Sequence, residues 1–330
     1  MGELRFFISV CVVVFHTSGY LGNIGYSSVF CFIIISGYCN IFSLEKGYNF
    51  KNYWWGKIKK IYVPYCVAVI FMGILWHIFY SDIPEAFPAI QNSFKAVDVL
   101  KNLYYSYQIP KDNEWWIFNA FPQLLPQNWT DPILWLMYIL APIIVYIKRQ
   151  SVVYYVMFGL MSLGAPILSI VRHLDFPNYR YRSFFCLIIY FYLGTLLFYL
   201  KPYIKKIKHE KRLLLVLELL YVLYFASTKH VQLEKNVMLS LPIVILMVTS
   251  AMNIERNYLD KLLSKMSYYI YLTHFVALAI WKILVHKMQI LGIKDYINML
   301  AIVVITILIS IGCIGIEKMI GKRVNIACKE

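Results

Sequence analysis

Long runs of hydrophobic residues recur along the chain and are separated by short polar segments. A helix needs about 20 mostly apolar residues to cross the hydrocarbon core of a bilayer. By that measure the pattern predicts about ten membrane-spanning helices, near residues 4–20, 26–43, 61–80, 132–147, 152–171, 183–200, 213–228, 236–252, 267–285 and 296–317. The expected fold class is therefore all-α, a polytopic transmembrane helical bundle that forms a single domain over residues 1–330.

The composition supports a membrane location for this bundle. Of the 330 residues, 60% are hydrophobic and 15% are charged, whereas a soluble domain has about 25% charged residues. This proportion of charge is too small to cover a water-soluble globule, and the hydrophobic content excludes intrinsic disorder. The seven cysteines include no C-x-x-C pair, so the sequence signals no redox pair and no metal is expected.

The basic residues are distributed unevenly between the loops. If all ten spans cross, five segments share one side with the N-terminus: the loops 44–60, 148–151, 201–212 and 253–266 and the tail 318–330. About 21 of the 32 Lys and Arg residues lie on that side. The positive-inside rule then predicts that both termini are cytoplasmic and that the loop near 81–131 is outside. The net charge of +15 indicates contact with anionic lipid headgroups and no nucleic-acid partner.

Two ionisable residues in the first span are candidates for chemistry. Ionisable side chains inside a bilayer are costly and are functional candidates by default. Arg5 and His16 are eleven residues apart, which puts them on one helical face, separated by about 16 Å along the axis. Histidine titrates near neutrality and so suits a general base. The alternative is structural, a snorkelling arginine and a hydrogen-bonded histidine.

Two further motifs lie at the ends of the second and third spans. Ser36, followed by Gly37, could hydrogen-bond across helices, although small-residue helix packing is the favoured explanation when the pair is taken alone. Lys57 and Lys60 are three residues apart and share a helical face at the cytoplasmic mouth of the third span. Two neighbouring cations suit a phosphorylated cytosolic ligand, and the alternative is an ordinary positive-inside anchor.

Candidates with weaker signals lie farther along the chain. Trp135 is in the fourth span, and Arg180 and Arg182 are in the outer loop before the sixth. His274, in the ninth span, is a second intramembrane histidine and could equally be a hydrogen-bonded core residue.

The order of these motifs carries a resemblance that no single motif carries. Arg5-x10-His16 comes first, Ser36-Gly37-Tyr38 ends the second span, and Lys57-x-x-Lys60 opens the third. A later Trp135, Gly194 and the run from Ser267 to His274 complete the series. The chain thus resembles the acyltransferase-3 family of integral-membrane acyltransferases. The family commonly has two arginines where Lys57 and Lys60 stand, and lysine keeps the charge but lacks the bidentate fork.

The resemblance implies an enzyme that moves an acyl group, usually acetyl, from cytosolic acyl-CoA to a hydroxyl of a cell-envelope carbohydrate. O-antigen, capsule and exopolysaccharide are typical acceptors, and the bacterial cytoplasmic (inner) membrane is the expected location. The chain has no Trp-Ser-Leu-x-x-Glu element around Trp135, so no role for that acid is carried over.

Roles for the candidate residues follow from this layout. Acyl-CoA is anionic, so Arg5, Lys57 and Lys60 are expected to bind it on the basic side. His16 is the expected general base on the acceptor hydroxyl, or is itself transiently acylated, with Arg5 and Ser36 positioning the reacting groups. Acceptor-binding residues are expected to be Trp135, Arg180, Arg182 and His274, the arginines for an acceptor such as a lipid-linked sugar.

Two other classes of function are compatible with ten spans and a few buried charges. One is a non-catalytic transporter or flippase for glycolipids or oligosaccharides, which would favour two repeated halves with broken helices. The sequence shows no convincing repeat between spans 1–5 and 6–10. The other is a polysaccharide polymerase, for which the outer cluster of Arg172, His173, Arg180 and Arg182 is the only indication.

Overall fold

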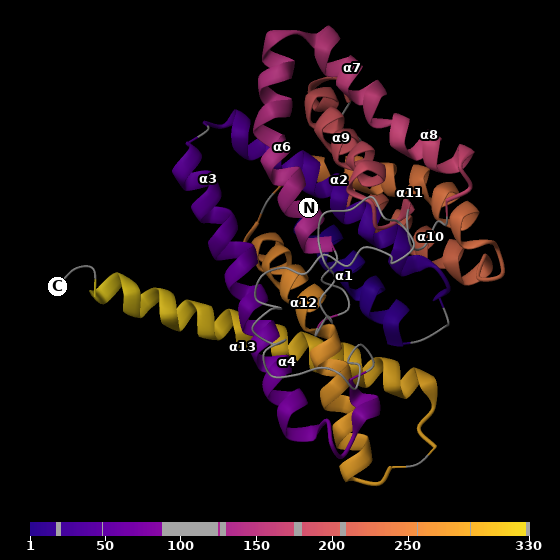
Figure 1. Ribbon diagram of the computed structural model, residues 1–330, viewed down its shortest axis with the longest axis vertical. Helices are drawn as coiled ribbons and strands as arrows, with labels where there is room; N and C mark the ends of the chain where they lie inside the picture. The colour runs from indigo at the N-terminus through magenta and orange to yellow at the C-terminus, as the bar shows by residue number, and fades with distance from the viewer. Residues whose placement is uncertain are drawn as a thin grey trace.

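The computed structural model describes residues 1–17, 21–47, 49–87, 125, 130–174, 180–204, 209–255, 257–290 and 292–327. Their secondary structure is helical, without a strand in this part of the chain, which confirms the all-α class (Figure 1). The longer helices are α1 (Gly2–Thr17), α2 (Ile24–Glu45), α3 (Phe50–Lys57), α4 (Val63–Phe79), α6 (Thr130–Gln150), α7 (Val152–Ser162), α8 (Gly164–Val171), α9 (Phe184–Leu200), α10 (Glu210–Ser227), α11 (Leu233–Asn253), α12 (Tyr258–Lys287) and α13 (Asp295–Ala327).

Nine of the ten predicted spans coincide with one long helix each, and the span 152–171 coincides with the consecutive helices α7 and α8. Eight of the described helical segments are long and apolar enough to cross a membrane. The two that do not qualify are α1 and α10. α1 has 16 residues, and α10 begins with the charged residues Glu210, Lys211 and Arg212 and carries Glu218. Their crossing stays a prediction, as does the cytoplasmic location of the termini. Most of the expected outer loop near 81–131 lies outside the described residues.

α2 is the central helix of the bundle. It packs most extensively against α9 and also contacts α1, α6 and α11. α1 lies between α2 and α12, and α12 packs in turn against α13 and α4. The C-terminal half of α13 extends away from the other helices (Figure 1). Candidate residues on α1, α2, α6 and α12 are thereby gathered in the interior of one bundle.

The contact between α2 and α9 depends on two glycines. A Cβ added to Gly37 would lie 2.1 Å from the carbonyl oxygen of Phe191, and one added to Gly194 would lie 1.9 Å from that of Ile34. Small residues at such positions let two transmembrane backbones approach closely. Helix packing therefore accounts for Gly37, the residue next to Ser36.

Side-chain caps explain where two helices near the interior begin. The side chain of Asn49 accepts a hydrogen bond from the backbone N–H of Asn52 at the start of α3, at 3.1 Å. Asn257 does the same for Asp260 at the start of α12, at 2.7 Å. Each cap satisfies a backbone donor that has no partner within its own helix.

Polar contacts between helix ends fall into two groups. On the predicted cytoplasmic side, Arg149 pairs with Glu45 at 2.9 Å, and Lys201 donates to the carbonyl oxygen of Met252 at 2.9 Å. On the opposite side, Lys282 donates to the carbonyl oxygen of Glu85 at 2.7 Å. All three join ends that the ten-span alternation puts on the same side. The contacts therefore agree with the alternation, while the assignment of one side to the cytoplasm rests on charge.

The outward faces of several helices are apolar. Met161 on α7 is 76% exposed, Val171 on α8 is 67% exposed and Leu219 on α10 is 59% exposed. In water such surfaces would associate, whereas lipid tails solvate them without penalty. Together with the eight candidate spans, they indicate a multi-pass membrane protein.

Candidate active site

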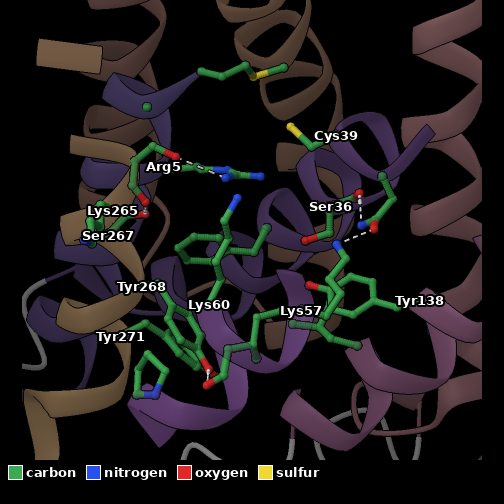
Figure 2. A pocket seen from close by; sticks show the side chains of 18 of the residues that line it. Arg5, Ser36, Cys39, Lys57, Lys60, Tyr138, Lys265, Ser267, Tyr268 and Tyr271 are labelled. Carbon is green, nitrogen blue, oxygen red and sulfur yellow. Dashed lines mark hydrogen bonds between the residues drawn. The ribbon is translucent and has the colours of Figure 1, made fainter. Parts of the chain in front are cut away.

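A cavity of about 720 Å³ lies between α1, α2, α6, α12 and the segment that joins α3 to α4. That segment contains a π-helical turn, Ile58–Tyr62. Single π-turns are rare and are frequently found at functional sites. Of the residues to which the sequence analysis assigned a role, four line this cavity: Arg5, Ser36, Lys57 and Lys60 (Figure 2).

Three cations form one end of the cavity, which we call the cationic end: Arg5, Lys57 and Lys60. They come from α1, from the last residue of α3 and from the π-helical turn. Figure 2 shows the tips of Arg5 and Lys60 directed into the cavity. Within the described residues, none of the three forms an ion pair with a carboxylate. Uncompensated cations in one partly enclosed space favour an anionic ligand.

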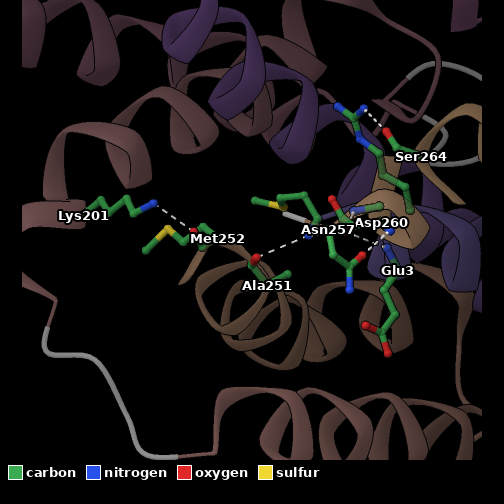
Figure 3. A network of polar contacts seen from close by, with 10 residues as sticks. Glu3, Lys201, Ala251, Met252, Asn257, Asp260 and Ser264 are labelled. Atoms are coloured by element: carbon green, nitrogen blue, oxygen red, sulfur yellow. Dashed lines mark hydrogen bonds and ion pairs between the residues drawn. The ribbon is translucent and has the colours of Figure 1, made fainter. Parts of the chain in front are cut away.

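Contacts with α12 hold Arg5 in place. The Asp260 carboxylate accepts hydrogen bonds from the backbone N–H groups of Gly2, at 2.6 Å, and of Glu3, at 3.4 Å (Figure 3). Asp260 thus satisfies backbone donors at the first turn of α1, where negative charge also suits the helix dipole. The Arg5 guanidinium donates to the Ser264 hydroxyl at 3.2 Å. These contacts fix the helix end that carries Arg5 without neutralising its charge.

Asn40 orients Lys57 and was not identified from the sequence. Its side-chain oxygen accepts hydrogen bonds from the Lys57 ammonium, at 2.5 Å, and from the Tyr53 hydroxyl, at 2.9 Å. Its amide nitrogen donates to the backbone carbonyl of Ser36 at 2.7 Å. The Lys57 ammonium also lies 4.0 Å from the ring centroid of Tyr138, a favourable cation–π arrangement. Asn40 follows Ser36 by four residues, a spacing that places both on one helical face.

Helix geometry sets the distance from the cationic end to the opposite end of the cavity. Asp131 precedes Tyr138 by seven residues on α6, which is two turns on the same face and about 10 Å along the axis. Tyr271 follows Ser264 by seven residues on α12. The hydroxyls of Thr130 and Tyr271 lie 2.6 Å apart and join the two helices. We call Thr130, Asp131 and Tyr271 the inner end of the cavity.

A pair of stacked histidines lies next to the inner end. The rings of His16 and His274 have centroids 5.2 Å apart and are inclined by 22°. The Phe275 ring lies 5.0 Å from the His16 ring and 4.7 Å from that of His274. Neither histidine lines the cavity itself, but His274 comes three residues after Tyr271 on α12. The sequence indicated each histidine separately, and the fold brings them together.

The hydrogen bond of His274 fixes which of its nitrogens carries a proton. Its Nδ1 lies 2.7 Å from the backbone carbonyl of Tyr271. A carbonyl oxygen only accepts, so Nδ1 must carry the proton, and the neutral ring then has its lone pair on Nε2. Within the described residues Nε2 has no hydrogen-bond partner, and His274 is 1% exposed whereas His16 is exposed.

The other candidates from the sequence lie away from the cavity. The ring of Trp135 stacks on that of Trp54, with centroids 5.9 Å apart, and neither residue lines the cavity. The Arg180 guanidinium pairs with the Glu234 carboxylate through two hydrogen bonds, one of them 2.7 Å long. Arg182, two residues on, is half-buried and is not among the cavity residues. Their assignment to acceptor binding stays a prediction.

The comparisons with known proteins identify a family for most of the chain. A family model described as an acyltransferase domain, that of the acyltransferase-3 family, matches residues 4–317. The matched region contains all of the cavity residues except Met1 and Gly2. No curated protein and no solved structure matches the chain.

Proposed function

Because the chain belongs to the acyltransferase-3 family, we propose that it transfers an acetyl group from cytosolic acetyl-CoA to a hydroxyl of a cell-envelope glycan. The observation that carries the proposal is the cavity that connects three uncompensated cations with a polar end beside two stacked histidines. The proposed location is the bacterial cytoplasmic membrane, and O-antigen, capsule or exopolysaccharide is the proposed acceptor.

The cationic end is the proposed site for the phosphates of the donor. Coenzyme A carries several negative charges at one end and its thioester at the other. Arg5 and Lys60 can reach phosphate oxygens with charge-assisted hydrogen bonds, which are about twice as strong as neutral ones. With the phosphates there, the flexible pantetheine arm extends toward the inner end, two helical turns away. Ser36 lies along this path and can donate to the thioester oxygen.

His16 is the proposed general base. As the acceptor oxygen attacks the thioester carbonyl carbon, His16 takes the hydroxyl proton. The carbon–sulfur bond then breaks, and the coenzyme A thiolate leaves and takes the proton back from the imidazolium. The products are an O-acetyl ester and a free thiol. A route through acetylated His16 gives the same products in two steps, and the stacked His274 orients the ring in both.

Release of free thiol tests the acyl-transfer chemistry directly. We expect membranes that contain the chain to release coenzyme A from acetyl-CoA when envelope glycan is added, and we expect the glycan to gain acetyl mass. A transporter, a flippase or a polysaccharide polymerase consumes no thioester. Mass spectrometry of envelope glycans from cells with and without the chain measures the second product. The absence of both products would contradict the proposal.

Replacement of His16 tests the proposed base. His16→Ala should lower the rate about 10²- to 10⁴-fold, the range that general-base catalysis contributes. The matched control is His230→Ala, because His230 is exposed and lies outside the cavity. Thiol release by both purified variants is compared at equal amounts of folded protein. A rate for His16→Ala close to that of the control would refute the role of His16.

A further inference from the structure

Three carboxylates line the cavity, and their surroundings differ. Asp260 accepts hydrogen bonds from the start of α1. Glu317 pairs with Lys265 at 2.8 Å and accepts a hydrogen bond from Tyr269 at 2.7 Å. Asp131 is completely buried, yet neither of its oxygens has a hydrogen-bond partner within the described part of the chain. It is thus the one cavity carboxylate, among those described, that the protein leaves unsatisfied.

An unsatisfied buried carboxylate requires an explanation. Burial removes the water that would otherwise solvate the group, and native proteins normally compensate with hydrogen bonds or a cation. Asp131 lies in the first turn of α6, where the helix dipole favours a negatively charged side chain. The dipole alone does not account for the residue, because no backbone N–H of that turn donates to its oxygens. A ligand in the cavity can supply the missing donors.

The position of Asp131 indicates which ligand this is. It lies at the inner end with Thr130 and Tyr271, about 10 Å along α6 from the Tyr138 ring that contacts Lys57. Asp131 offers no positive charge to a phosphate, so the anionic part of a donor is directed to the cationic end. The group that reaches the inner end must donate hydrogen bonds, and it must lie near the histidine pair.

We propose that the Asp131 carboxylate accepts hydrogen bonds from the acceptor and so holds its reactive hydroxyl beside His16 and His274. This inference rests on the proposed function. Two unsatisfied oxygens on one carboxylate fit two adjacent hydroxyls of a sugar ring, because each hydroxyl donates one hydrogen bond. The acceptor class is then a polyol with neighbouring hydroxyls. Asp131 acts as a positioning residue and takes no part in the bond changes.

Asp131→Asn tests this role because it keeps the size of the side chain and removes its charge. The acceptor probe is envelope glycan from cells that lack the chain, with its O-acetyl groups removed by mild base. We expect the apparent KM for this glycan to rise about tenfold, in the range for losing a hydrogen bond to a charged group. The Kd for acetyl-CoA, measured by titration calorimetry, should change less than about twofold, because the donor phosphates bind at the other end.

The matched control is Glu218→Gln. Glu218 is also buried and has an unpartnered oxygen, but it lies on α10 and does not line the cavity. We expect this variant to have the wild-type KM for the glycan. Asp131→Asn should also keep or raise the thermal unfolding temperature in detergent, since it removes an uncompensated buried charge.

Several results would overturn the inference. An unchanged KM for the glycan, a weakened Kd for acetyl-CoA, or an equal effect of Glu218→Gln would each contradict acceptor binding by Asp131. Failure of Asp131→Asn to accumulate as folded protein would identify a structural role instead. Failure of the proposed function is distinguishable, because the wild-type chain would then release no thiol from acetyl-CoA with any preparation of glycan.

Discussion

At the scale of single residues, the cations of the site are held in place by hydrogen bonds that do not neutralise them. Arg5 donates to a serine hydroxyl and Lys57 to the Asn40 amide oxygen, both neutral partners. A carboxylate partner would hold the cation equally well but would compete with an anionic ligand. Neutral partners therefore fix the geometry and preserve the electrostatic attraction.

Lys60 gives the cleanest test of this attraction, because no described residue pairs with its ammonium and it is exposed. We expect Lys60→Ala to weaken acetyl-CoA binding about tenfold at low salt, the effect of losing one charge-assisted contact. The loss should shrink as the salt concentration rises, because salt screens exposed charges. Lys60→Arg should bind at least as tightly as the wild type. Titration calorimetry at two salt concentrations measures the Kd for acetyl-CoA of each variant. An equal loss of affinity in Lys60→Ala and Lys60→Arg would contradict a role for the charge of Lys60.

At the scale of helices, the cavity depends on how closely α2 approaches its neighbours. Gly37 and Gly194 let α2 and α9 meet backbone to backbone, and Ser36 and Asn40 lie on the same stretch of α2. Contacts at the opposite side of the cavity are long-range as well, since the Tyr268 hydroxyl donates to the Ile61 carbonyl at 2.9 Å. Positions in the cavity are thus set by packing between helices.

Substitution of these glycines should loosen the bundle. Gly37→Ala places a methyl carbon against the Phe191 carbonyl, so the helices must separate, and overpacking of this kind costs about 1–3 kcal/mol. We expect a lower thermal unfolding temperature in detergent. Gly312→Ala on α13 is the control, because nothing lies within 4 Å of its added Cβ and alanine favours a helix over glycine. Equal unfolding temperatures for the two variants would show that the close approach contributes no stability.

At the scale of the whole molecule, the membrane topology depends on whether two helices cross the bilayer. Two predicted spans do not qualify as crossing helices, α1 because it is too short and α10 because it carries several charged residues. α10 packs against α11, and its outward residues, such as Leu219 and Leu223, are apolar and exposed. That surface favours contact with lipid, so we expect α10 to cross with its charged N-terminal turn in the cytoplasm.

Cysteines on the two sides of α10 test this topology. Lys211 lies in the first turn of α10 and His230 follows its C-terminal end, and both are exposed. In intact cells, a membrane-impermeant maleimide should label His230→Cys, whereas Lys211→Cys should react only after the membrane is opened. Labelling of the wild-type chain gives the background from its own cysteines. Labelling of both positions from one side would show that α10 does not cross. The loops after α10 would then lie on the opposite side of the membrane from the one predicted.

The helices were predictable from the sequence because the length of an apolar run is a local property. The convergence of Arg5, Lys57 and Lys60 was predictable too. Helical spacing puts Lys57 and Lys60 on one face, and the positive-inside rule puts all three on the cytoplasmic side. Asn40 and Asp131 were not predictable, because their significance depends on residues elsewhere in the fold. Asn40 accepts a hydrogen bond from Lys57, whereas the Asp131 oxygens have no partner among the described residues. The pairing of Arg180 with Glu234 joins residues 54 positions apart, and no local signal marks it.

The cationic end has a consequence for how the proposed reaction responds to metabolism. Arg5 and Lys60 would recognise the phosphates of the donor, and those phosphates are unchanged when the acetyl group has left. Free coenzyme A should therefore occupy the site nearly as well as acetyl-CoA and compete with it. Under this mechanism the rate of acylation follows the ratio of acetylated to free coenzyme A, so the modification of the envelope reports the carbon supply of the cell.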